Sequence, residues 1–445
     1  MRTRLTGGTC NGFEVSAAVM ALLISLLVIA MAGQAAERAD KLPVIYAVEV
    51  IGNRVTSERF IKHEMSLRPG MTATPEQLEA DRLHLESLGL FNHVEVRLAV
   101  DEGRAVVLVT VTEPLFYYLF PVFEYDFDAP DRTVYGGGFH HRNVRGRGET
   151  ITLSGWTGFN RGGYIDYNDP WFRIRGIYSL SWRVGYSDRD LATPDGGTTR
   201  REKTAAGLMV RRRLQRDIWL GIGLEWTEQR SDADFYTHSD KNRDRLVTSR
   251  LVYEDDHRDY RYYPSQGHFA RLEGEASYIL EDRHHFLREK FDVRAYRTFG
   301  GLILAARLRA ETSQRQLPYY SRLVLSRSRI RAGSDYGAGG WTTVSGSFEV
   351  RFNVFPLRYV SLGGIPVVGS YLLNMPFSIE GVLFSDAGYS RYDDDGHAVG
   401  RRFYAWGGGL QFQMPYVHTS HVLIGWTPHQ RLTEPSFTSR MGVTF

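Results

Sequence analysis

The chain has 445 residues, enough for two or three soluble domains or for one large barrel with a small extra domain. Its formal net charge is only +3, so the composition gives no signal for a polyanionic partner such as a nucleic acid. Aromatic residues make up 13% of the chain and there are 45 glycines, which is typical of proteins rich in strands, tight turns and aromatic girdles.

Residues 1–35 are predicted to be a secretory signal peptide. Two arginines precede an apolar run over residues 17–32, and cleavage after Ala35 fits the small-x-small rule. An uncleaved anchor helix is the alternative for this run. The single cysteine, Cys10, lies in this segment, so the mature chain would have none. No other stretch approaches ~20 apolar residues, so an integral membrane protein with this sequence would have to be a barrel.

Residues 42–114 are predicted to form a small α+β domain. An alternating strand over residues 45–51 ends at the turn pair Gly52-Asn53. Two helices follow, with Thr56 as the expected cap of the first, and two strands joined by a tight turn close the segment. The order β-α-α-β-β indicates an open sheet with two helices on one face.

Four motifs in this domain resemble a POTRA module, the polypeptide-transport-associated domain: Val-Glu-Val-Ile-Gly-Asn-Arg-Val (48–55), Leu-Arg-Pro-Gly (67–70), Leu-Glu-Ser-Leu-Gly-Leu-Phe (85–91) and Val-Thr-Glu-Pro (111–114). The resemblance implies a docking domain whose sheet edge accepts an extended polypeptide by strand addition. Gly52 and Asn53 are then structural turn residues, and no chemistry is assigned to the domain.

Residues 117–445 keep a period of two almost throughout. Leu220, Ile222 and Leu224, for example, alternate with glycines and a glutamate. Charged residues recur on the polar face of strand after strand, which a soluble sandwich seldom shows. At roughly 20 residues per strand and turn, the region predicts an all-β transmembrane barrel of about sixteen antiparallel strands after the α+β domain.

The last ten residues of the chain predict the closing strand of this barrel. Phe437, Met441, Val443 and Phe445 fall on one face of residues 436–445, and polar residues fall on the other. An apolar face toward lipid and a polar face toward the lumen suit an outer-membrane barrel that ends on an aromatic residue. An edge strand of a soluble sandwich is the alternative for this segment taken alone.

Several landmarks of this region resemble the BamA/TamA superfamily of outer-membrane assembly and translocation barrels. They include Asn-Val-Arg-Gly-Arg-Gly-Glu (143–149), Asp-Pro-Trp (169–171), a hairpin with Asp-Asp-His-Arg-Asp (255–259) and Tyr-Pro-Ser-Gln-Gly (263–267), and Ile-Arg-Ala-Gly (330–333). The resemblance implies a long loop that folds back into the barrel and is fixed by an arginine at its tip.

Carried over to this chain, the tip arginine is Arg331 and its candidate partners are Glu349 and Asp386. The alternation supports this independently, because both acids lie on strand faces opposite apolar residues. A guanidinium between two carboxylates makes bidentate, charge-assisted hydrogen bonds. Ala332 stands where the family has glycine, and Gly333 where it has an aromatic, so the tip is expected to pack less tightly.

No catalytic, cofactor or metal site is predicted. The sequence lacks a Gly-x-Ser-x-Gly elbow, which excludes a fused lipase of that type. The adjacent pairs His140-His141 and His284-His285 point to opposite faces of their strands, so each is a poor metal site. The protein is therefore not expected to be an enzyme.

The predicted function is to assemble, insert or translocate other polypeptides at the outer membrane of a Gram-negative-type bacterium, with the POTRA domain in the periplasm. The expected partners are unfolded outer-membrane or secreted polypeptides, outer-membrane lipids, and periplasmic accessory proteins or chaperones. A two-partner-type secretion pore for one client and a passive channel are the alternatives; an enzyme housed in a barrel is disfavoured.

Overall fold

The computed structural model describes most of the chain after residue 43, and the predicted signal peptide with Cys10 lies outside the described residues. The described ranges are 44–101, 104–124, 133–172, 177–192, 198–325, 329–332, 339–366, 369–394, 397–414, 419–428 and 430–442.

The N-terminal module has the predicted order of elements: β1 (Ile45–Ile51), α2 (Glu58–Glu64), α3 (Pro75–Ser87), β2 (His93–Asp101) and β3 (Arg104–Thr112). The sheet order is β1-β3-β2, with β1 parallel and β2 antiparallel to the central β3. Alternate residues of β3 are buried, and Val107 and Val109 pack with Phe60, Ile61 and Leu85 from the two helices. The helices therefore cover one face of the sheet, as the sequence predicts.

The two helices begin differently. Thr74 and Gln77 form a reciprocal capping box at α3, with side-chain-to-backbone distances of 3.3 and 3.0 Å. The expectation that Thr56 caps α2 is wrong: Ser57 precedes the helix and its side chain makes no capping hydrogen bond. The Thr56 hydroxyl instead accepts a hydrogen bond from the Asn143 side-chain amide at 2.9 Å. This residue therefore contacts the barrel and does not cap the helix that follows it.

The remaining strands form one sixteen-stranded antiparallel sheet in which each strand pairs with its neighbours in the chain. The strands are β4 (Tyr117–Glu124), β5 (Val134–Arg142), β6 (Thr150–Gly158), β7 (Arg161–Phe172), β8 (Tyr178–Ala192), β9 (Thr198–Gln215), β10 (Ile218–Ser231), β11 (Arg243–Asp256), β12 (Gly267–Ile279), β13 (His285–Phe299), β14 (Leu302–Ser313), β15 (Thr342–Val360), β16 (Met375–Asp394), β17 (His397–Gln413), β18 (Thr419–Trp426) and β19 (Ser436–Gly442).

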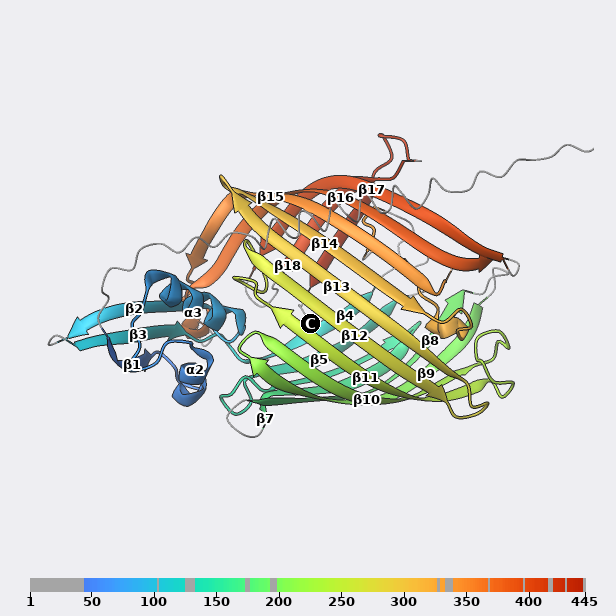
Figure 1. Cartoon of the computed structure of the whole chain (residues 1–445), viewed down its shortest axis with the longest axis horizontal. Helices are drawn as coiled ribbons and strands as arrows, with labels where there is room; N and C mark the ends of the chain where they lie inside the picture. The colour runs from blue at the N-terminus through green and yellow to red at the C-terminus, as the bar shows by residue number, and fades with distance from the viewer. Residues whose placement is uncertain are drawn as a thin grey trace, which may run out of the picture.

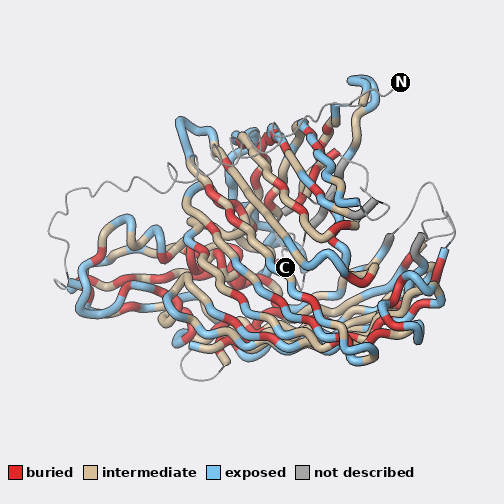
Figure 2. Tube along the Cα trace, turned by 45° about the vertical axis from the view of Figure 1, so that its right-hand side comes forward, coloured by how far each residue is buried: buried red, intermediate tan, exposed pale blue. Residues whose placement is uncertain are grey.

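Figure 1 shows this sheet rolled up as a tilted barrel, with the N-terminal module against one end. Figure 2 shows exposed and buried residues alternating along the strands. Ile222 and Leu224 are 68% and 57% exposed on the outer wall, whereas Arg250 and Glu275 pair across β11 and β12 on the inner face at 2.8 Å. An apolar outer wall with a charged interior is the arrangement of a transmembrane barrel.

Among the described residues, no helix combines the length and the apolar character needed to cross a membrane.

Candidate functional site

The loop between β14 and β15 enters the barrel, where Arg331 meets both predicted carboxylates. Asp386 of β16 accepts hydrogen bonds from the Arg331 backbone N–H and Nε at 2.9 Å, and from Nη2 at 2.6 Å. Glu349 of β15 accepts from Nη1 at 2.6 Å. The guanidinium also lies 4.1 Å above the Phe384 ring. We call Arg331, Glu349 and Asp386 the loop lock. The structure brings these three residues together, and the role of the contact remains a prediction.

Residues around Arg331 pack closely against the inner wall. Ile330 and Ala332 are buried in a small apolar cluster with residues of β17. Ala332 adopts the left-handed region at φ 64°, the conformation that the family's glycine would favour. Its methyl group faces Gly425, where a Cβ atom would approach it to 2.7 Å. The expected looser packing is therefore not found at Ala332, because Gly425 provides the space. Gly333 lies outside the described residues.

A second arginine of the same loop was missed by sequence reasoning. Arg329 forms an ion pair with Glu311 of β14 and donates to the Thr343 hydroxyl of β15 at 2.9 Å. Arg329 lies two positions before Arg331, and in an extended segment that spacing places two side chains on the same side. This spacing was the sequence signal that could have identified Arg329. The loop is thus tied to β14, β15 and β16 by two guanidinium groups, and this arrangement provides a fixed ionic cross-link between loop and wall rather than a reactive centre.

The N-terminal module is joined to the barrel by many contacts besides the short segment between β3 and β4. The turn between β5 and β6 lies against the start of α2, where the Ser57 N–H donates to the Gly146 carbonyl at 2.8 Å. Gly146 has φ 70°, and a Cβ atom there would lie 2.3 Å from the Val55 carbonyl oxygen. The Phe60 and Trp171 rings meet edge to face at 5.4 Å. Glycine at position 146 is therefore required for this close approach.

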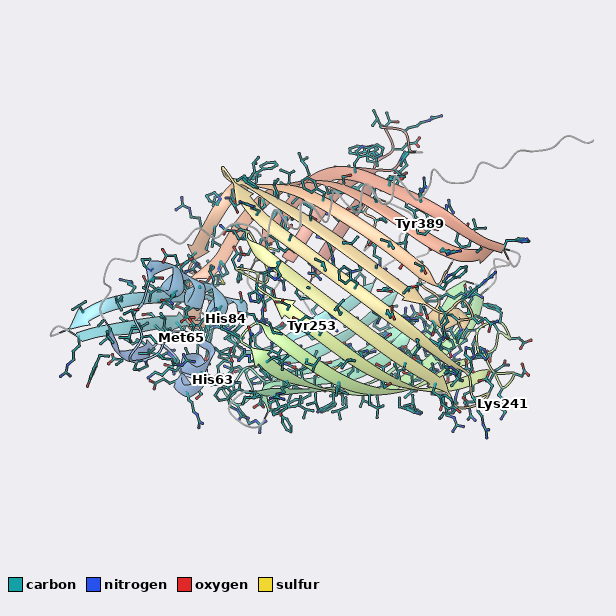
Figure 3. All side chains as sticks on the ribbon, in the orientation of Figure 1. His63, Met65, His84, Lys241, Tyr253 and Tyr389 are labelled. Atoms are coloured by element: carbon teal, nitrogen blue, oxygen red, sulfur yellow. The ribbon has the colours of Figure 1, made fainter. Side chains whose placement is uncertain are left out.

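Ion pairs from the end of β9 and from the turn that follows it complete this junction. Arg213 makes a bidentate pair with the buried carboxylate of Glu64, at 3.0 and 2.8 Å. His84 Nε2 lies 3.1 Å from Glu64 Oε2, the oxygen that also accepts from Arg213 Nη2. Arg216 pairs with buried Asp81 at 2.7 Å, and Asp81 also accepts backbone hydrogen bonds from Ser66 and Leu67. Figure 3 places His63 and His84 on the side of the module that faces the barrel.

Burial and these contacts act in opposite directions on the pKa values of Glu64 and His84, two titratable groups at this junction. Burial alone would raise the pKa of the Glu64 carboxyl, but the neighbouring His63 and His84 imidazoles and the Arg213 guanidinium hold that pKa well below its ordinary value. Burial lowers the pKa of the His84 imidazole, and the hydrogen bond with Glu64 only partly opposes this. The junction therefore contains an ionised carboxylate beside a neutral imidazole.

The far side of the module contacts the turn between β15 and β16. The Asn92 amide donates to the carbonyls of Tyr371 and Leu373, both at 3.0 Å. Another contact comes from the turn between β11 and β12, where the Arg261 N–H donates to the Ser87 hydroxyl at 3.1 Å. We call these contacts together with Glu64–Arg213 and Asp81–Arg216 the module junction. It draws on turns from widely separated parts of the sheet.

The predicted turn residues of the module have structural contacts. Gly52 has φ 91°, and a Cβ atom there would lie 2.2 Å from the Val111 carbonyl oxygen. The Asn53 side chain donates to the Thr56 carbonyl at 2.9 Å. Glu113, from the Val-Thr-Glu-Pro motif, accepts the N–H groups of residues 54–56 at 2.7–3.0 Å, so it closes the same loop. These residues shape the loop that contacts the barrel.

The two ends of the sheet, β4 and β19, form the seam. Within the described residues no strand pairing joins them. Leu119 of β4 is 82% exposed and Phe437 of β19 is 68% exposed. Met441 lies opposite Ser420 in the register of β18 and β19, whereas Val443 and Phe445 lie outside the described residues.

Comparison with known proteins agrees with this architecture. Residues 143–419 match the Omp85 superfamily domain, and residues 43–113 match the POTRA family described as surface antigen variable number repeat. A search of the curated proteins finds no match.

Similar solved structures share the fold at low sequence identity. BamA from Haemophilus ducreyi lacking POTRA domains 1–3 is 14% identical with a TM-score of 0.53, covering 91% of this chain and 84% of that one. CdiB from Escherichia coli is 11% identical with a TM-score of 0.52, covering 97% and 98%. CdiB from Acinetobacter baumannii is 12% identical with a TM-score of 0.52, covering 89% and 73%. The chain belongs to the Omp85 superfamily, as an outer-membrane β-barrel protein with its POTRA module in the periplasm.

Proposed function

We propose that this protein inserts polypeptides into the outer membrane through the seam between β4 and β19. The observation that carries the proposal is the seam itself, which lacks pairing within the described residues although the neighbouring strands are paired in full register. Unpaired backbone donors and acceptors at a sheet edge can template an arriving strand. A client hairpin could therefore add to β4 or β19 without any chemical step.

The POTRA module supplies a sheet edge that can receive a client strand. β2 pairs only with β3 along the described residues, so its other edge is open to strand addition. Such addition uses main-chain hydrogen bonds and depends little on client side chains. The module junction holds this edge at the periplasmic end of the barrel, close to the route that a client would take toward the membrane.

Two features favour lateral insertion over passage through the lumen. The loop lock holds the tip of a long loop inside the barrel, and the module rests on turns from distant parts of the sheet at the periplasmic end. Both lie on the lumen path and neither lies on the outer wall. The second candidate, a secretion pore for one client, requires both to move aside.

The test uses purified protein in liposomes to which an unfolded barrel client is added. Protease protection of the client is then measured in intact vesicles and after detergent lysis. We expect a folded client embedded in the bilayer. Release of the client into the vesicle lumen would indicate secretion and contradict insertion. Steady ion conductance with no effect on the client would indicate a passive channel.

A further inference from the structure

Three side chains of the types that ligate metals, Asp255, His257 and His268, meet at the periplasmic end of the β11–β12 hairpin. The Nδ1 atom of His257 lies 2.5 Å from Asp255 Oδ1, and Nε2 of His268 lies 3.8 Å from Asp255 Oδ2. The two imidazoles stack with their centroids 5.1 Å apart and their planes at 15°. One donor atom from each of the three residues lies within 4.8 Å of the others.

Strand geometry explains why residues eleven positions apart converge. β11 and β12 pair antiparallel up to Asp256 and Phe269, and the His257 N–H then donates to the His268 carbonyl at 2.9 Å. Asp255 near the end of β11 and His257 just after it lie on one face, and position 268 continues the same face on β12. Leu251 and Leu272 on that face are exposed on the outer wall. The cluster therefore points away from the lumen, at the periplasmic rim of the barrel.

We propose that Asp255, His257 and His268 bind a divalent first-row transition metal ion, and we use Zn²⁺ as the example and as the probe ion. Zinc bonds to imidazole nitrogen and carboxylate oxygen at about 2.0–2.2 Å, so donor atoms about 3–4 Å apart can share one ion. The separations in the cluster require only small side-chain rotations to reach this range. Two imidazoles favour zinc, copper or nickel over magnesium and calcium, which prefer oxygen ligands.

Three protein ligands leave at least one coordination position for water or for an external ligand. The cluster is partly exposed, so that position is open to the periplasm. A bound ion would tie together both ends of the 257–268 turn. The same turn carries Arg261, whose N–H donates to Ser87 of the POTRA module. Metal occupancy would therefore stabilise a turn on which the module rests.

A second histidine pair gives an internal comparison. His238 and His284 stack at 4.0 Å and 17° at the extracellular end, and His238 pairs with Asp282. The Nε2 atom of His284 lies 3.3 Å from the Gln316 carbonyl, which occupies the nitrogen that a metal would need. His238 and His284 thus stack and contact a carboxylate, but they do not provide three donor atoms for one ion. Within the described part of the chain, this pair is not among the groups with three possible metal ligands.

The experiment uses the mature protein, purified in detergent with a tag that contains no histidine and stripped of metal. Zn²⁺ is titrated by calorimetry, and Co²⁺ is titrated by its visible absorption. We expect one ion per chain, with the affinity at least about tenfold lower in His268→Ala and in His257→Ala. His284→Ala is the matched control and should bind as the unaltered protein does.

A measurement on the unaltered protein covers the case in which a variant folds poorly. Diethyl pyrocarbonate modifies accessible imidazoles, and mass spectrometry locates the modified residues. We expect Zn²⁺ to protect His257 and His268 and to leave His238 reactive. The proposal is overturned if no stoichiometric binding is seen, if the variants bind as tightly as the control, or if Zn²⁺ protects neither His257 nor His268.

Discussion

The wall formed by β15 and β16 and the seam between β4 and β19 use the same kind of strand but are held very differently. β15 and β16 pair along most of their length, from Thr342↔Arg391 to Val360↔Met375, and the loop lock adds Arg331 across them. β4 and β19 each pair on one side only within the described residues. The ionic contacts of the loop lock join Arg331 to β15 and β16 and not to β4 or β19. Separating the two seam strands would therefore break none of them.

The largest effect is expected from closing the seam covalently. The mature chain would contain no cysteine, so cysteine pairs can be introduced stepwise along β4 and β19 without background reaction. Oxidation of a pair that bridges the strands should abolish client insertion, and reduction should restore it. A pair at Leu304 and Val350, which are partners in the β14–β15 register, is the control that should leave insertion unchanged. Full activity with an oxidised seam would contradict the proposed route.

The next largest effect is expected from Arg331→Ala. Asp386 would stay buried without its cation, and leaving one member of a buried pair uncompensated costs about 3–5 kcal/mol. The loop should become sensitive to protease and insertion should slow, while the barrel itself stays folded. Lys241→Ala, in the exposed hairpin at the opposite end from the module (Figure 3), is the control. Unchanged protection of the loop would argue against a locking role.

A smaller effect is expected from Arg213→Ala at the module junction. The variant leaves Glu64 buried with only imidazole partners, so docking of the module should weaken by roughly 3 kcal/mol. Hydrogen exchange in α2 and α3 should rise, with the barrel strands unaffected. Arg212→Ala removes the exposed neighbouring arginine and should change nothing. Equal exchange in the two variants would mean that the ion pair does not hold the module.

The smallest effect is expected from acidification. The pKa of His84 is lowered in the folded protein. Its contribution to the stability of the module junction is therefore complete above the ordinary pKa of about 6.5 and declines as the pH falls below that value. The pKa of Glu64 is also lowered, so its contribution to the stability of the junction is lost only at still lower pH, where the carboxylate takes up a proton. Arg213, Arg216 and Asp217 face these groups from the barrel.

Hydrogen exchange in α2 and α3, corrected for its intrinsic pH dependence, should therefore show gradual loosening of the junction from about pH 6.5 downward. His84→Gln, which keeps a polar side chain but does not titrate in this range, should flatten the upper part of the profile. A loosening that begins only when the pH rises would contradict the sign of both pKa shifts.

The sequence by itself determined the architecture of both domains, and together with the family resemblance it predicted the three residues of the loop lock. Period-two alternation, the turn signals of the module and the Ile-Arg-Ala-Gly motif are local patterns, and local patterns report secondary structure and the face on which a side chain lies. The sixteen strands and the β-α-α-β-β order follow from such patterns. The meeting of Arg331 with Glu349 and Asp386 followed from face assignment together with family resemblance.

Only the tertiary structure decided which turns meet. Glu64 and Arg213 are separated by 149 positions, and nothing in either local pattern indicates that they pair. His257 and His268 are eleven positions apart and become neighbours only because the β11–β12 hairpin brings them together. Thr56 was misassigned for the same reason, since its hydroxyl serves Asn143 rather than its own helix. Periodicity specifies a face, whereas contacts between distant turns depend on how the whole sheet curves and where the module comes to rest.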